Sequence, residues 1–368
     1  MANLDVHSIR GNEDSICCFR PISTGGVRML WELTTRCDLT CLHCFRVVQD
    51  RRLELSTGRC IDILDELTEI DVRKLIFVGG ESTLRTDLSQ LILEAHRRNL
   101  LVDLNTHAGL IDNSLARTLR DSGLKEATVS LDGSTSETHD SQRNRPGSFA
   151  KTLRGIRCLR VAGIEVDLSF VPTRINHHEL ASVLDLALAL DAASLTFAGL
   201  VIDGAAITNR SRIELKPSER RAVVSEIRHL RERRNATLPI RSSRLVETAP
   251  LDTCGAGTTV GAIDAGGFLH PCALYWIDRT PENSLHERSV QEIWHGSTFR
   301  RIRDLTANPA NCPTSCSEVL SCRGGCRGVA QLERGSSMFP DPLCERADVR
   351  TPKSGSDLIT IQTLNAIY

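Results

Sequence analysis

The most constraining feature of this chain is a group of three cysteines, Cys37, Cys41 and Cys44, spaced as C-x3-C-x2-C. The group directly follows the apolar run 29–33, a pattern that predicts a strand ending in a loop. Three thiolates this close can hold three irons of a [4Fe-4S] cluster and leave the fourth iron open to a substrate or cofactor. Zinc, with His43 as a fourth ligand, and buried thiols are the alternatives. The spacing after a strand favours the cluster.

The composition limits the class of protein and its partners. The chain has 368 residues, of which 40% are hydrophobic, enough for a sizeable core in one large or two medium domains. Its 45 basic and 46 acidic residues nearly cancel, which argues against nucleic acid or an anionic membrane as a partner. The sequence shows neither an apolar run of membrane-helix length nor a secretory signal pattern, so we expect a cytoplasmic protein. In that reducing compartment, 14 clustered cysteines predict metal sites rather than disulfides.

Alternating apolar and amphipathic stretches predict an α/β fold with a parallel sheet and helices outside it. Ser56 is a plausible N-cap for a helix with Ile61, Leu64 and Leu67 on one face. Runs expected to form strands recur at 28–34, 73–78, 100–105, 126–131, 165–172 and 194–200. Helical spacing occurs at 84–96, 115–119, 149–161 and 180–190. Six β-α units can form a barrel or an open doubly wound sheet, and periodicity leaves both open.

The composition and periodicity of the sequence change in its last third. Residues 215–236 have a charged, arginine-rich helical pattern, which is typical of a solvated helix face. After about residue 240 glycine, proline and cysteine become more frequent, and helical periodicity weakens except near 289–304. This pattern predicts a second, loop-rich unit that is held by metal rather than by a large apolar core.

Taken with the strand ends downstream, the cysteine group resembles the radical SAM superfamily, and the resemblance covers most of residues 28–345. It implies a partial (β/α)6 TIM-like barrel in which the open iron binds S-adenosyl-L-methionine (SAM). An electron from the cluster would cleave SAM to methionine and a 5′-deoxyadenosyl radical. The resemblance also implies a flavodoxin- or ferredoxin-type reductant as a partner.

Polar residues at several strand ends match the SAM-binding positions of that superfamily. After the second strand, two glycines would let the backbone approach the SAM amino group, and the glutamate that follows suits an ammonium. Ser82 stands next, where the family usually has proline. The turn 130–133 resembles the ribose-contacting turn, and Arg143 matches the arginine that meets the SAM carboxylate. The resemblance thus assigns cofactor binding to Gly79, Gly80, Glu81, Ser130, Asp132, Arg143, Thr173 and Asn176.

A second set of seven cysteines resembles the SPASM extension, which binds two auxiliary [4Fe-4S] clusters, with zinc as the alternative. Family topology implies an inner cluster on Cys254, Cys272 and Cys326, whose fourth position is another ligand or an open site. The outer cluster would be held by the remaining four, of which the first two have C-x3-C spacing where C-x2-C is common. These four are Cys312, Cys316, Cys322 and Cys344. Three [4Fe-4S] clusters are therefore expected.

The resulting organisation has four parts. We expect an N-terminal segment at 1–27, a radical SAM core at 28–236, a cysteine-ligated SPASM domain at 237–346 and a tail at 347–368. Four cysteines are left over. Cys60 and Cys158 fall in helical patterns and are expected in the core. Cys17 and Cys18 are expected to be ordinary thiols, with hydrogen-atom donation to a substrate radical as the alternative.

Auxiliary clusters suggest a route for electrons, so we expect an oxidoreductase, or an epimerase if a cysteine donates hydrogen. About 27 residues precede the first strand, so we expect no N-terminal leader-binding domain, while a separate leader-peptide-binding protein stays possible. Ala273 stands where sulfatase-maturing relatives have an aspartate that acts as a base.

These observations favour abstraction of hydrogen from an unactivated C–H bond of a sugar-containing small molecule in natural-product biosynthesis, giving oxidation or epimerisation. The alternative is maturation of a ribosomally made peptide by crosslinking, thioether formation or epimerisation. A non-catalytic iron–sulfur electron carrier is less favoured, because a carrier needs no SAM contacts.

Overall fold

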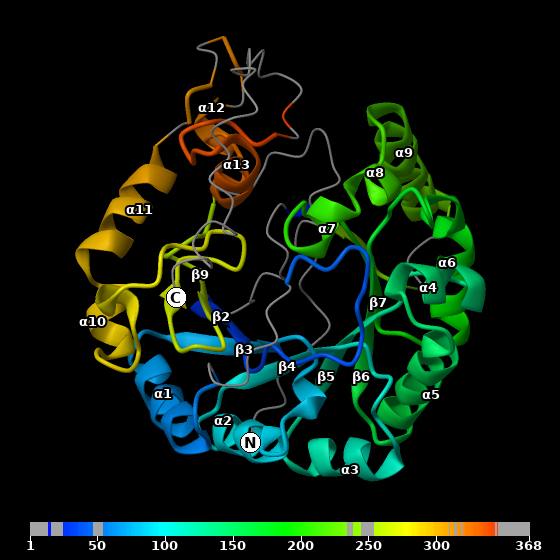
Figure 1. Cartoon of the computed structure of the whole chain (residues 1–368), viewed down its shortest axis with the longest axis horizontal. Helices are drawn as coiled ribbons and strands as arrows, with labels where there is room; N and C mark the ends of the chain where they lie inside the picture. The colour runs from blue at the N-terminus through cyan, green and yellow to red at the C-terminus, as the bar shows by residue number, and fades with distance from the viewer. Residues whose placement is uncertain are drawn as a thin grey trace.

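The centre of the molecule is a curved, mostly parallel sheet. The computed structural model describes residues 14–15, 25–46, 54–233, 238–243, 254–308, 310–312, 315–317, 319–342 and 344. Ten strands pair in the order β1-β8-β7-β6-β5-β4-β3-β2-β9-β10. The sheet forms an arc with helices along its outer side (Figure 1). The fold is therefore a partial barrel, as expected from the sequence.

Strands β2 to β7 follow one another in space as they do in the chain, each parallel to the next. A doubly wound sheet would reverse its strand order at a switch point, and between β2 and β7 this sheet does not. The open question between barrel and doubly wound sheet is thus settled in favour of the barrel. Each predicted run overlaps a strand: Val27–Glu32 (β2), Val72–Val78 (β3), Leu101–Thr106 (β4), Glu126–Ser130 (β5), Glu165–Phe170 (β6) and Ser194–Ala198 (β7).

The connections between these strands carry the outer helices. Ser56 caps the first of them, accepting a hydrogen bond from the Arg59 amide at 3.2 Å, as the sequence predicts. The long helices are Thr57–Glu69 (α1), Leu88–Arg97 (α2), Asn113–Asp121 (α3), Ser136–Arg143 (α4), Ser148–Val161 (α5), Leu180–Ala189 (α6) and Pro217–Arg233 (α9). Shorter turns are Ser82–Leu84 (η2), His177–Glu179 (η3), Ala205–Thr208 (α7) and Arg210–Ile213 (α8).

The C-terminal third extends the same sheet. Strand β9 (Val260–Ile263) pairs in parallel with β2, and β10 (Leu269–His270) pairs antiparallel with β9. At the other edge, β8 (Ile240–Ser243) joins β7, and β1 (Asp14–Ser15) joins β8. The helical pattern at 289–304 forms two helices rather than one. The remaining elements are Pro281–Asn283 (η4), Val290–Trp294 (α10), Ser297–Ala307 (α11), Val319–Cys322 (α12) and Arg327–Arg334 (α13).

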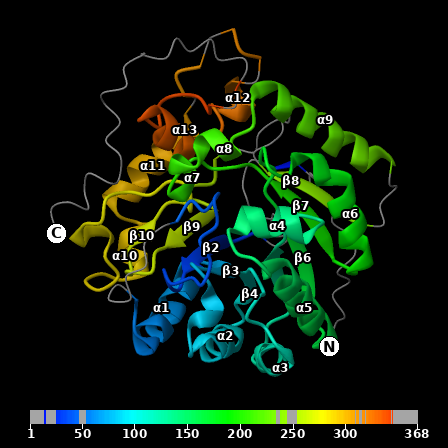
Figure 2. The ribbon, with the colours of Figure 1, turned by 45° about the vertical axis from the view of Figure 1, so that its right-hand side comes forward.

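The main hydrophobic core is shared between the barrel and the segment that follows β9. Ile263, Leu285 and Trp294 belong to the same buried cluster as Trp31 and Leu64. The sequence pattern did not reveal this sharing, because the packed residues lie in short elements without long periodicity. In both views α12 and α13 lie at the top of the molecule, above α11 (Figures 1 and 2). The expected boundary at residue 237 stays a prediction. No described helix has the length and apolar composition that a membrane span requires.

Gly155 in α5 offers a test of how the helices are fitted to the sheet. A Cβ at this position would lie 2.0 Å from the carbonyl oxygen of Ala108, which follows β4. We predict that Gly155→Ala lowers the free energy of unfolding by about 2 kcal/mol, because backbone has to shift. Gly58→Ala in α1 is the matched control, since nothing lies within 4 Å of its Cβ. Thermal unfolding should show that Gly155→Ala is less stable than the wild type and that Gly58→Ala is unchanged or slightly more stable. Equal stability of the two variants would contradict the prediction.

Candidate active site and cluster-binding site

The first cysteine group lies in the loop after β2, at the carboxyl end of the parallel strands. The loop is folded on itself: the Leu39 amide donates to Cys37 Sγ at 3.4 Å, and the Cys44 amide donates to the Cys41 carbonyl at 3.2 Å. Burial, and after it the nearby Cys41 and Cys37, raise the pKa of the Cys44 thiol to about 11. The three thiols therefore converge, and binding of iron has to displace their protons.

The Gly-Gly-Glu turn after β3 holds the start of this loop. The Gly80 amide donates to the Thr34 carbonyl at 2.8 Å, and the Glu81 amide donates to the Arg36 carbonyl at 2.7 Å. A Cβ on Gly80 would lie 2.2 Å from that Arg36 oxygen, and one on Gly79 would lie 2.4 Å from the Thr34 oxygen. Glycine is required here because the two backbones touch.

The carboxylate of Glu81 points into the protein rather than to solvent, with 1% of the residue exposed. It accepts hydrogen bonds from Thr106 Oγ1 at 2.7 Å, from the His107 amide at 2.9 Å and from Thr83 Oγ1 at 2.7 Å. Glu81 thus joins the ends of β3 and β4. A direct contact between its carboxylate and SAM stays a prediction.

Arg143, at the last turn of α4, reaches the cysteine loop. Its Nη2 lies 2.7 Å from Asp132 Oδ2, and its Nη1 donates to Cys41 Sγ at 3.6 Å. His43 Nε2 lies 3.3 Å from the same Asp132 oxygen. Burial alone would raise the pKa of Asp132, but Arg143 and His43 outweigh it and hold the pKa below its usual value.

The Nε atom of Arg143 is buried and has no hydrogen-bond acceptor among the described residues. A donor left over beside Cys41 fits an acceptor that the cofactors would bring, either a cluster sulfide or the SAM carboxylate. The guanidinium also supplies a positive charge next to a ligand that has to become a thiolate. Converging thiols and this cation together fit a [4Fe-4S] cluster with SAM.

Thr173 and Asn176 lie beneath this arginine and are fully buried. Thr173 Oγ1 donates to Gln142 Oε1 at 2.8 Å, and Asn176 Nδ2 donates to the Asp132 carbonyl at 3.1 Å. Their side chains thus support the turn that carries Asp132. Ser130 is half-buried at the end of β5. Direct SAM contacts of these residues stay predictions.

His107 is a site residue that the sequence interpretation did not single out. Its Nε2 lies 2.8 Å from Asp38 Oδ1 and 3.2 Å from Glu81 Oε2. Burial opposes a charge on this imidazole, but Glu81, Asp38 and a hydrogen bond with Cys37 raise the pKa of His107 to about 10. Its Nδ1 accepts a hydrogen bond from the Gly109 amide at 2.9 Å, so the proton on Nε2 faces the two carboxylates beside the first cysteine. Its place directly after a predicted strand was the signal available in the sequence.

The second cysteine set falls into two groups in space. Cys322, Cys344 and Cys316 each lie near enough to Cys312 to raise its pKa, after burial as the larger cause. These are the four residues expected around the outer cluster. Cys254 and Cys272 pack on one small apolar cluster, while Cys272 also packs with Cys326 on the next. The three cysteines expected around the inner cluster are thus neighbours through Cys272.

Cys17, Cys18 and the tail 347–368 lie outside the described residues. Cys60 and Cys158 are buried in α1 and α5, as expected.

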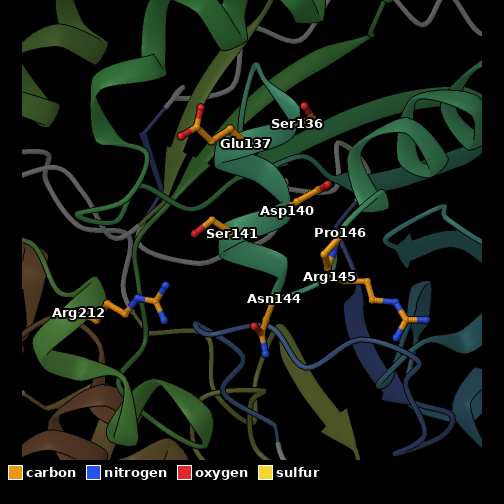
Figure 3. A pocket seen from close by; sticks show the side chains of 8 residues that line it. All are labelled: Ser136, Glu137, Asp140, Ser141, Asn144, Arg145, Pro146 and Arg212. Atoms are coloured by element: carbon orange, nitrogen blue, oxygen red, sulfur yellow. The ribbon is translucent and has the colours of Figure 1, made fainter.

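A pocket of about 420 Å³ lies on the outward face of α4. Figure 3 shows Glu137, Ser141 and Asn144 along that face, with Arg212 across from them. His139 and Arg143, on the other face of α4, are buried. Its lining includes none of the cysteines that the structure describes.

The buried pair of Asp132 and Arg143 generates a prediction. We expect Asp132→Asn to lower the free energy of unfolding by about 3 kcal/mol, because it leaves a buried guanidinium without its counter-charge. Asp191→Asn is the matched control, since the Asp191 side chain, which pairs with Arg160, is 81% exposed and should change stability by less than about 1 kcal/mol. Thermal unfolding of both variants checks this. Equal losses of unfolding free energy in the two variants would show that the buried pair stabilises the fold no more than the exposed one.

Comparisons with known proteins agree with this geometry. Residues 31–187 match the family model of the radical SAM superfamily, and residues 254–323 match that of an iron–sulfur cluster-binding domain, SPASM. Mycofactocin maturase MftC of Mycobacterium ulcerans is 31% identical, over 86% of this chain and 87% of the relative. The AdoMet-dependent heme synthase of Oleidesulfovibrio alaskensis is 28% identical, over 85% of this chain and 86% of the relative.

A solved structure with the same fold is Streptococcus suis SuiB bound to precursor peptide SuiA, with a TM-score of 0.72 and 18% identity over 87% of this chain and 76% of that chain. The likeness extends across both the barrel and the C-terminal third. Because two family models and a relative above 30% identity span most of its length, the chain belongs to the radical SAM superfamily with a SPASM domain, and is an enzyme that uses SAM and [4Fe-4S] clusters.

Proposed function

We propose that this enzyme matures a ribosomally made precursor peptide by abstracting hydrogen from an unactivated C–H bond. The observation that carries the proposal is the similarity to mycofactocin maturase over 86% of the chain. The peptide-bound structure of SuiB, which has the same fold, supports it. The relatives reported above are maturases and heme synthases, so they support the peptide alternative better than the sugar-containing substrate that the sequence favoured.

SAM bound on the cluster of Cys37, Cys41 and Cys44 would supply a 5′-deoxyadenosyl radical for this abstraction. Two of the described residues around that site have clear tasks. Gly80 fixes the cysteine loop through backbone hydrogen bonds. Arg143 places a buried cation and a free donor at Cys41.

We further propose that Cys254, Cys272 and Cys326 hold an inner auxiliary cluster. The outer one would be held by Cys312, Cys316, Cys322 and Cys344. These clusters would supply an acceptor for the electron that an oxidative outcome releases. The support is the grouping of the thiols in space, which matches the two expected ligand sets.

Oxidation of a porphyrin side chain is the second candidate function. The observation that favours it is the 28% identity with the AdoMet-dependent heme synthase over 85% of this chain. Both candidates need the same radical chemistry and differ in substrate. They are therefore separated by offering both substrates.

The decisive experiment is anaerobic turnover of the reconstituted enzyme with SAM and dithionite. One arm receives peptides encoded next to the gene, and the other receives iron coproporphyrin III. We expect 5′-deoxyadenosine to form, with a mass change in a peptide and none in the porphyrin. A Cys41→Ala variant serves as the control without SAM cleavage. A change confined to the porphyrin would overturn the peptide proposal, and absence of 5′-deoxyadenosine with every substrate would favour an electron carrier.

Iron and sulfide analysis tests the three-cluster proposal. We predict about twelve irons per chain in the reconstituted wild type and about eight in a Cys312→Ala, Cys316→Ala double variant, because only the outer cluster loses ligands. Cys158→Ala is the control, since that thiol is buried in α5 far along the chain from both sets and should keep the full content. A wild type with about four irons would sink the proposal.

A further inference from the structure

Arg46 lies where the two cysteine regions meet. It follows Cys44 by two residues, and the Cys44 thiol donates to its carbonyl oxygen at 2.9 Å. Its Nη2 lies 3.5 Å from the carbonyl oxygen of Ala273, the residue after Cys272. The Arg46 guanidinium therefore lies between the loop of the SAM-binding cluster and a proposed ligand of the inner auxiliary cluster.

The position of the guanidinium is fixed by an aromatic ring. Arg46 Cζ lies 3.4 Å from the ring centroid of Trp276, at stacking distance. The His270 ring also packs against Trp276, with 4.2 Å between the ring centroids. Trp276 Nε1 donates to the Ala273 carbonyl at 2.6 Å, which prevents the ring from turning. Arg46 is thus presented on a rigid support.

The charge of Arg46 is poorly compensated within the protein. The Nε atom lies 3.8 Å from Glu32 Oε1, beyond the length of an ordinary charge-assisted hydrogen bond. Burial raises the pKa of Glu32, which disfavours its negative form. Asp264 is already engaged by Arg279 at 2.7 Å and by His270 at 3.2 Å. Asp203 is near enough to act on the charge of Arg46, but no ion pair joins these two residues in the described part of the chain.

A second arginine–tryptophan contact in the same chain involves an arginine whose guanidinium makes short hydrogen bonds. Arg303 Cζ lies 5.3 Å from the ring centroid of Trp294. Its Nε donates to the Gly257 carbonyl at 2.6 Å, and its Nη2 donates to the Trp294 carbonyl at 2.5 Å. That guanidinium ties α11 to the segment before β9. Arg46, with only long contacts in the described part of the chain, has no comparable structural role.

We propose that Arg46, stacked on Trp276, binds a carboxylate of the substrate and so orients the substrate between the two cluster regions. The planar fork of a guanidinium matches the two oxygens of a carboxylate. A carboxylate also suits the site better than a phosphate, because a second negative charge would face the buried carboxylate of Asp264. The inference deepens the proposed function: a peptide offers a C-terminal or side-chain carboxylate, and a porphyrin offers propionates.

Equilibrium dialysis of the reconstituted enzyme with SAM and without reductant tests this site. Three pairs of probes are compared: acetylated tripeptides as C-terminal acids and as amides, amidated peptides with Glu and with Gln, and iron coproporphyrin III and its tetramethyl ester. We expect the wild type to retain the acid of at least one pair about tenfold more strongly than its neutral partner. Arg46→Gln should reduce that preference to about twofold or less, and Arg46→Lys to an intermediate value, because a lysine keeps the charge and loses the fork.

Arg303→Gln is the matched control, since it removes an arginine from the other stack and should leave the preference for acids unchanged. Iron and sulfide content shows whether each variant assembles its clusters. If Arg46→Gln does not assemble them, the test rests on the preference measured for Arg46→Lys. Equal or absent retention of acid and neutral probes in every pair would overturn the inference, as would an Arg46→Gln variant that keeps the preference. A preference confined to the porphyrin pair would support the carboxylate site and contradict the peptide function. A preference for peptide acids without 5′-deoxyadenosine in the turnover assay would leave the site standing and sink the proposed function.

Discussion

One buried guanidinium, that of Arg143, connects the parts on which the site depends. It pairs with Asp132 at the end of β5 and donates to Cys41 in the loop after β2. A charge in this place is tolerated only because Asp132 compensates it, and the carboxylate is in turn held by the Val171 amide at 2.9 Å and by His43. The cysteine loop, α4 and two strand ends are thereby fixed relative to one another. The loop also buries Leu39 and Leu42, so apolar packing and this ion pair together hold the three proposed cluster ligands in place.

The continuous sheet holds the two cysteine regions close together, as Arg143 holds the strand ends. Because β9 pairs with β2 directly, the segment that leads to Cys272 begins beside the strand that leads to Cys37. The short distance between Arg46 and Ala273 follows from that pairing. The electron route proposed between the clusters thus depends on ordinary backbone hydrogen bonds between two strands.

The grouping of the seven later cysteines was implied by the resemblance to SPASM proteins, whereas local pattern was enough to predict the barrel strands and the Ser56 cap. Each of these depends on spacing within a few residues, and spacing is visible in one sequence. The contact between Arg46 and Trp276 could not be predicted in this way, because its partners are far apart in the chain and meet only through the β2–β9 pairing. For Glu81, Asp132, Thr173 and Asn176 the sequence placed the residues correctly at strand ends. It could not show which partners their side chains bind, because a strand-end position does not determine where a side chain points.

The order of the sheet has a consequence for how the chain is made. Strand β2 is the first strand of the barrel to leave the ribosome, whereas its neighbour β9 begins at Val260. Until β9 emerges, one edge of β2 offers unpaired amide and carbonyl groups to any other strand nearby. A growing chain that already contains β2 to β7 is therefore a sheet with an open edge beside its unmetallated cysteines, and a chain shortened before β9 would keep that edge permanently. The C-terminal third thus covers the open edge of β2 during synthesis, in addition to carrying its own cysteines.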